Sequence, residues 1–435
     1  MPSELLKSLL GSSEKSEDDS EENEEKTSSF ATFFNIFNTN MGTGILAMPY
    51  IIKLTGYWGV FLIILIAFLG NYTGKLLIYC LKYTPSPDGK PLTTYADLGN
   101  VFWPNYGWYL VHVTNFFEQF SHCTLFLIMC GTVLHHTFPN SGISESVWIS
   151  IISLSVLPYI FLRNMQHISW ISFITVLVTM GSSTCVLGYS IIHHDQWKHH
   201  KMAPFQVKHM SIAIGVATVT FSSTAYLPSI EQSMRYSGEF NAIMDFTYTL
   251  VTLIKYNYGI IVYFMFLKHT EQIMTLSLPL GPFRTILCVA VVITALLFYA
   301  VPMYTLYDIV EKQLNIPLFL KEEEKYYIRG HRISKYGMRL VFILLSILVA
   351  VLVPHFGLLM AFVGSFTGTI LVFVYPCIFH VKLHHHEMKW YHIALDVSIA
   401  AFGIFGCIFG VTYSTIQITR EYDFYRQWGI IVDED

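Results

Sequence analysis

Charged residues are scarce in this sequence. Only 13% of the 435 residues are Asp, Glu, Lys or Arg, whereas 53% are apolar. A soluble chain of this length needs far more charge, because polar side chains have to cover its exterior. The scarcity therefore excludes an ordinary soluble protein and predicts helices whose outer surface faces lipid.

Sequence motifs for enzymatic chemistry are also missing. No glycine-rich loop ends in Gly-Lys-Ser/Thr, the loop that binds phosphate in ATP-driven pumps. The seven cysteines lie in apolar runs without the spacing of a metal site, so we expect them to pack in the core. Clustered histidines at 193–194, 199–200 and 384–386 are expected in solvated loops. We therefore expect no enzyme, no cofactor, no bound metal and no nucleic-acid partner.

Apolar runs of about 20 residues, long enough to cross a bilayer as a helix, recur along the chain. Lys and Arg collect on the cytosolic side of short loops, and 17 of the 26 lie on the side of the N-terminus. The N-terminus is therefore predicted to be cytosolic, and an odd helix count places the C-terminus on the opposite side. We predict an all-α membrane protein of about eleven transmembrane helices, at 31–52, 57–81, 106–137, 146–162, 168–192, 210–235, 241–267, 284–313, 338–354, 356–381 and 391–417.

The first 29 residues differ from the rest. Eight acidic residues lie from Glu14 to Glu25, and no aromatic residue accompanies them. Residues 1–29 are therefore predicted to be a disordered cytosolic tail, either a sorting or regulatory segment or a solvated tail without a specific role. This polar start does not suggest a cleavable signal peptide. Residues 30–425 are predicted to form the transmembrane domain, and 426–435 a short C-terminal tail.

Two of the apolar runs are interrupted in a matching way. Gly42-Thr43-Gly44 interrupts the first run, and Pro49 follows five residues later. Ser222-Ser223-Thr224 interrupts the sixth, with Pro228 five residues after Ser223. Broken helices at corresponding places in two blocks of five indicate a secondary transporter with a LeuT-type inverted repeat, helices 1–5 and 6–10, plus one extra helix. Since unwound backbone inside a membrane has to line a cavity, the breaks predict the site.

Two full charges, Glu118 and Lys255, lie near the middle of the third and seventh runs. A charge there costs at least about 2.5–3.5 kcal/mol, so each has to face a partner or water. Asn115, Glu118 and His122 share one helix face, with Gln119 beside them. This polar face predicts a proton or substrate-amine site. The alternative is a buried Glu118–Lys255 ion pair that fixes helix packing, and both can hold together.

Several segments then resemble a known family. They are Val353–Met360, Gly364–Gly368, Leu227–Glu231, Ser237–Phe240, Leu157–Asn164 and Tyr72–Lys75. Over about residues 30–425 the sequence resembles the amino acid/auxin permease superfamily, and within it the vesicular inhibitory amino-acid (GABA and glycine) transporters. Glu118 and Lys255 fall where that family has a glutamate in its third helix and a lysine in its seventh, so the resemblance implies that both are functional.

The resemblance implies a proton-coupled secondary transporter of small amino acids, most simply an exchanger that loads GABA or glycine into acidic, synaptic-type vesicles. The C-terminus would then be luminal. The segment Met41–Leu46 is more similar to plasma-membrane and lysosomal members of the superfamily, which keeps two alternatives open. They are a proton symporter in one of those membranes and a sensor that binds amino acids without translocating them. The predicted substrate contacts are Gly42, Thr43 and Gly44, whose amides would hold the carboxylate, and Ser222, Ser223 and Thr224.

Overall fold

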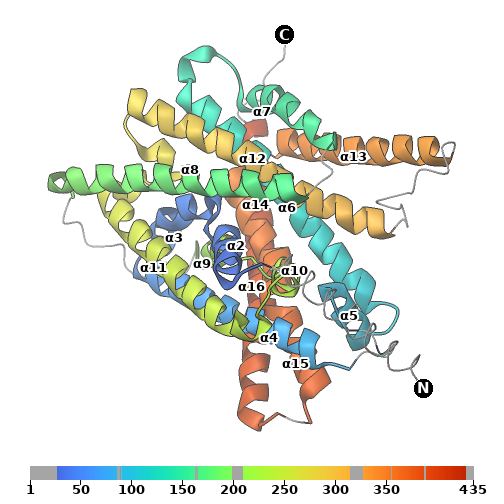
Figure 1. Cartoon of the computed structure of the whole chain (residues 1–435). Coiled ribbons are helices and arrows are strands. Elements are labelled where there is room, and N and C mark those ends of the chain that lie inside the picture. The colour runs from blue at the N-terminus through green and yellow to red at the C-terminus, as the bar shows by residue number, and fades with distance from the viewer. Residues whose placement is uncertain are drawn as a thin grey trace, which may run out of the picture.

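The computed structural model of the chain describes residues 27–85, 89, 91–161, 165–197, 209–313, 327–353, 355–386 and 388–427. Its elements are helices, arranged as a bundle (Figure 1). In the described part, seven helices are long and apolar enough to cross a membrane, and three shorter apolar helices accompany them. With the interrupted first segment, they make the eleven predicted spans.

Nine of the eleven spans are helical from end to end. α13 begins at Tyr327 rather than at 338, and α16 ends at Gln427 rather than at 417. The α13 extension carries two Arg and one Lys, and the α16 extension carries two Arg, one Glu and one Gln. These residues are good helix formers, so each helix continues past its apolar stretch. The nine are α4 (Tyr57–Tyr83), α6 (Gly107–Thr137), α7 (Glu145–Ser153) with η3 (Leu154–Phe161), α8 (Met165–Ile192), α11 (Phe240–Phe266), α12 (Pro282–Gln313), α13 (Tyr327–Leu352), α14 (Phe356–Val363) continued through π-helical η9 (Gly364–Gly368) and η10 (Ile370–Val374) into α15 (Tyr375–His384), and α16 (Trp390–Gln427).

The first span is interrupted where the sequence predicts it. Helix α2 (Ser29–Met41) ends at Gly42, whose φ of +25° lies in a region that residues with a Cβ rarely adopt. A short 3₁₀ turn, η1 (Thr43–Ala47), leads into α3 (Met48–Thr55). Pro49 lies in the first turn of α3, where its missing N–H removes no intrahelical bond. The predicted break in the first helix is therefore confirmed.

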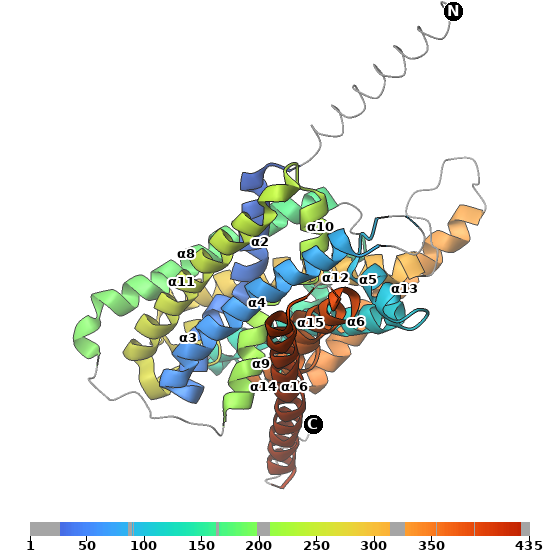
Figure 2. The same cartoon turned by 90° about the horizontal axis from the view of Figure 1, so that it is seen from below.

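The sixth span has the same construction. Helix α9 (Met210–Thr220) ends before a non-helical stretch at 221–226, and α10 (Leu227–Gln232) begins with Pro228 in its first turn. The interrupted spans cross closely: a Cβ built on Gly44 would come within 2.9 Å of the Thr220 Cβ. In both views α2, α9 and α10 lie among the longer helices (Figure 1 and Figure 2). The breaks thus face each other inside the bundle.

The predicted tail boundary needs a small correction. Thr27 forms a backbone bridge beside Met234, with its N–H donating to the Ser233 carbonyl at 2.7 Å and its carbonyl accepting from the Arg235 N–H at 2.9 Å. The Ser28 side chain caps α2. Residues 27–29 therefore belong to the folded part, because the start of α2 is anchored on the end of α10. Residues 1–26 and 428–435 lie outside the described residues.

The sequence predicted that the histidines at 384–386 lie in a solvated loop, and this prediction is wrong for His384. His384 is buried, and its Nε2 lies 3.1 Å from the Thr84 hydroxyl at the end of α4. Nearby, buried Asp396 of α16 accepts hydrogen bonds from Tyr72 at 2.7 Å and from His380 Nδ1 at 2.6 Å. These polar contacts join α4, α15 and α16, and His384 is buried where the three helices meet. The predicted cluster at 199–200 lies outside the described residues.

The contact between the breaks can be tested with Gly44→Ala. The added methyl group comes closer to Thr220 than real Cβ atoms come to other atoms, so the first and sixth spans have to move apart. Such overpacking costs about 1–3 kcal/mol. We expect a lower melting temperature of the purified protein. Gly238→Ala is the control, since no atom of the described residues lies within 4 Å of a Cβ built there. Equal behaviour of the two variants would contradict the close crossing.

Candidate substrate cavity

A cavity of about 140 Å³ lies between the two interrupted spans. A cavity of about 150 Å³ can bind a molecule the size of benzene, so this one has room for a small organic molecule. Its polar lining comes from the two breaks and from the middle of α6, and its apolar lining from α12 and α14 with part of α6. The lining residues are Asn38, Thr39, Asn40, Gly42, Thr43, Gly44, Glu118, Gln119, His122, Leu125, Phe126, Val219, Thr220, Ser222, Tyr226, Phe298, Val301, Pro302, Phe356 and Met360.

Glu118 supplies the acidic group of this cavity. Its side chain is 2% exposed, and its Oε1 accepts a hydrogen bond from the Ser222 hydroxyl at 2.5 Å. The other oxygen, Oε2, is buried and has no hydrogen-bond partner among the described residues. A buried carboxylate is costly unless each oxygen is satisfied. The carboxyl group is therefore suited to take up a proton or a cationic group from the cavity.

The polar face predicted around Glu118 is only partly in the cavity. Gln119 and His122 line it, whereas Asn115 lies one turn away and accepts a hydrogen bond from Gln119 Nε2 at 3.2 Å. Gln119 Oε1 in turn accepts from the Tyr226 hydroxyl at 2.7 Å. His122 Nδ1 lies 2.8 Å from the Glu118 carbonyl oxygen. This chain of contacts fixes the wall of α6 against the break in the sixth span.

The predicted substrate contacts divide into two groups. Thr43 and Gly44 line the cavity as the first residues of η1, where helical N–H groups have no intrahelical partner. Gly42 also lines it, but its N–H donates to the Asn38 carbonyl at 3.3 Å and is not free. Ser222 lines the cavity next to Glu118.

Ser223 and Thr224 are outside the cavity lining. Ser223 is buried, with its hydroxyl 2.8 Å from that of Tyr248 on α11. Thr224 is buried as well, and its hydroxyl has no partner among the described residues. The backbone makes tight turns here, with the Ser222 N–H donating to the Val219 carbonyl at 3.3 Å and the Ser223 N–H to the Phe221 carbonyl at 3.1 Å, so the side chains of the Ser-Ser-Thr run point in different directions. Ser223 thereby holds the break against α11.

Lys255 does not form the predicted ion pair with Glu118. Among the described residues no salt bridge joins them, and the ammonium instead donates to the carbonyls of Asn40 at 2.6 Å and Thr220 at 2.5 Å. Lys255 is fully buried and is not part of the cavity lining. Carbonyl groups freed by the two breaks lie closer to α11 than the carboxylate does, which explains the different partner.

Sequence reasoning missed most of the apolar wall. Phe126, Phe298, Phe356 and Met360 face the cavity from three helices, and Pro302 interrupts the hydrogen bonding of α12 beside them. Apolar residues in a membrane helix give no sign of whether they face lipid, a neighbouring helix or a cavity. Two signals were present: Pro302 inside a long apolar run, and the polar run at 38–40 before the first break.

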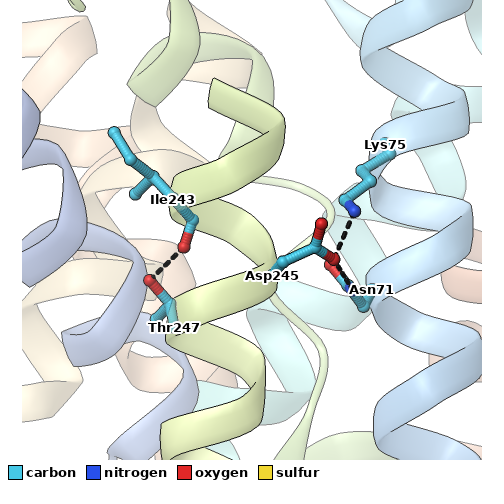
Figure 3. Close-up of polar contacts among 5 residues, drawn as sticks. All are labelled: Asn71, Lys75, Ile243, Asp245 and Thr247. Atoms are coloured by element: carbon cyan, nitrogen blue, oxygen red, sulfur yellow. Dashed lines mark hydrogen bonds and ion pairs between the residues drawn. The ribbon is translucent and has the colours of Figure 1, made fainter. Parts of the chain in front are cut away.

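An ion pair between Lys75 and Asp245 joins α4 and α11 away from the cavity. Figure 3 shows Lys75 and Asn71 of α4 pointing toward Asp245 of α11. The Lys75 ammonium and the Asn71 amide, the latter at 2.6 Å, both donate to Asp245 Oδ1. In the same view Thr247 donates to the Ile243 carbonyl of its own helix. The Asp245 side chain is 57% exposed, so this pair positions the helices more than it stabilises them.

The chain is similar to known transporters along nearly its whole length. A family model described as "Transmembrane amino acid transporter protein" matches residues 25–417. A vesicular inhibitory amino acid transporter of Xenopus tropicalis is 30% identical over 90% of this chain and 77% of its own. A vesicular GABA transporter of Caenorhabditis elegans is 25% identical over 94% of this chain and 83% of its own.

A solved structure shows the same fold at low sequence identity. It is the substrate-bound, outward-open state of a Na⁺-coupled sialic acid symporter, with a TM-score of 0.50, 12% identity, and coverage of 91% of this chain and 90% of that one. The chain therefore has the LeuT-type fold, with its interrupted helices in the first and sixth positions. By the extent of the family match, it belongs to the transmembrane amino acid transporter family and is a multi-pass membrane transporter rather than an enzyme.

Proposed function

We propose that the chain is a proton-coupled exchanger that moves a small amino acid, such as GABA or glycine, into an acidic vesicle. The observation that carries the proposal is the unpartnered Oε2 of Glu118 in the lining of a 140 Å³ cavity between the two breaks. The names of relatives at 25–30% identity support the choice of substrate. The cytosolic N-terminus predicted from the loops makes the opposite face luminal.

The cavity offers complementary ends to a zwitterion. At the start of η1, where helical N–H groups lack an intrahelical partner, those groups and the positive end of the helix dipole favour a carboxylate near Thr43 and Gly44. The unpartnered oxygen of Glu118 favours the ammonium group or a proton. Between them, the aromatic and methionine side chains of α6, α12 and α14 form an apolar wall. A short, flexible amino acid fits this arrangement better than one with a large side chain.

Competition at one carboxyl group would provide the coupling. When Glu118 holds a proton from the lumen, its charge is neutralised and a substrate ammonium is no longer attracted, so substrate leaves there. Release of the proton to the cytosol restores the charge and the attraction. One pH unit supplies about 1.4 kcal/mol per proton, and 100 mV supplies about 2.3 kcal/mol per net charge moved. For one proton and one net charge per cycle, gradients of that size concentrate an amino acid several hundredfold.

The direction of coupling can be measured with purified protein in liposomes. An acidic lumen with a positive potential inside should stimulate uptake of radiolabelled GABA or glycine, and collapse of both gradients should stop it. Uptake driven instead by an acidic exterior would show a symporter. Binding of the amino acid without flux under any gradient would show a sensor. Either of those two results contradicts the exchange proposal.

The role of the acidic group can be tested with Glu118→Gln. The amide keeps the size of the side chain and a hydrogen bond to Ser222 but cannot take up a proton, so gradient-driven uptake should fall to background. Melting temperature should stay near that of the wild type. Glu145→Gln is the matched control, because Glu145 of α7 is bonded to Thr132 and lies outside the cavity lining. Near-normal coupled uptake by Glu118→Gln would leave the carboxyl group with a structural role only.

A further inference from the structure

Lys255 lies in the middle of α11 with a fully buried side chain and no acidic partner among the described residues. Its Nζ is 2.6 Å from the Asn40 carbonyl oxygen, 2.5 Å from the Thr220 carbonyl oxygen and 4.2 Å from the centre of the Phe221 ring. All three contacts are with the negative ends of dipoles or with the negative face of an aromatic ring. The surroundings of Nζ are thus those of a cation site built from neutral oxygens.

The two carbonyls belong to the ends of different half-helices. Asn40 lies in the last turn of α2, and Thr220 is the last residue of α9. The final carbonyls of a helix have no intrahelical partner and carry the negative end of its dipole. Two such ends therefore converge on one point inside the membrane, where lipid offers a carbonyl group no partner. A positive charge at this point satisfies both ends at once.

We propose that the Lys255 ammonium is a tethered monovalent cation that takes the place of a dissociable ion such as Na⁺. In transporters with interrupted helices, unwound carbonyls and half-helix C-termini are the groups that hold such ions. Because the ammonium is covalently attached, it holds the two breaks together in every state of the cycle and is never transported. The wild-type protein consequently needs no Na⁺ for binding or flux. Removal of the side chain leaves a vacancy that accepts Na⁺ or a small primary ammonium ion.

Chemical rescue tests the vacancy directly. Lys255→Ala removes the three methylene groups beyond Cβ and the ammonium, and n-propylammonium has the same atoms. We expect that n-propylammonium or Na⁺ raises the melting temperature of purified Lys255→Ala, whereas choline at equal ionic strength does not. The wild type should show no difference among the three salts. This readout needs no substrate, so it stands even if the proposed exchange of GABA or glycine fails.

A lysine with a similar contact provides the matched control. Lys53 of α3 also donates to a backbone carbonyl, that of Thr270 at 2.7 Å, but in the described part of the chain only this one carbonyl receives it and neither break is involved. Lys53→Ala should therefore show no selective response to n-propylammonium. In liposomes, uptake by Lys255→Ala should be strongly reduced in choline medium and restored several-fold by n-propylammonium or Na⁺.

Two results would overturn the proposal. One is a well-folded Lys255→Ala protein whose melting temperature is the same in all three salts. The other is Na⁺-stimulated substrate uptake by the wild type, measured against choline in liposomes under a fixed pH gradient. The second measurement uses the native chain, so the proposal can be refuted even if Lys255→Ala does not fold.

Discussion

Every backbone N–H and C=O inside a bilayer has to find a partner within the protein, because lipid offers none. The interruptions after Met41 and Thr220 violate the simplest solution, which is a continuous helix. Each break frees carbonyl groups on one side and N–H groups on the other. The rest of the central structure can be understood as the consequence of these unsatisfied groups.

The carbonyl groups before the breaks and the N–H groups after the first break have different surroundings. The carbonyls at the ends of α2 and α9 receive the Lys255 ammonium, which is buried and permanently attached. The N–H groups at the start of η1 line the cavity instead. The chain itself thus supplies the partner of the carbonyl groups, whereas the N–H groups can receive a ligand with a negative charge. This asymmetry explains why a mid-membrane lysine can lie close to the cavity without forming its wall.

Much of the fold and part of the site could be predicted from the pattern of residues. Apolar runs predicted the spans, and matched Gly/Ser/Thr-to-Pro spacing predicted the breaks, because both depend on local backbone chemistry. Glu118, Gln119 and His122 were found because mid-membrane polar residues have to face something polar. The partner of Lys255 could not be predicted, since backbone carbonyls leave no trace in the sequence. The same applies to Ser223 and Thr224, whose direction depends on dihedral angles at the break, and to the apolar wall that Phe298 and Met360 help to form.

The central claim is that the cavity between the breaks is where the substrate binds. Thr43 lines this cavity, whereas Thr224 of the sixth span is buried outside it. The direct measurement is the rate at which a thiol reagent modifies Thr43→Cys, with and without substrate, after the exposed Cys185 is replaced by serine. We predict that Thr43→Cys reacts, that a transported amino acid slows its reaction, and that Thr224→Cys hardly reacts. A reaction rate at Thr43→Cys that no transported amino acid changes would contradict the account.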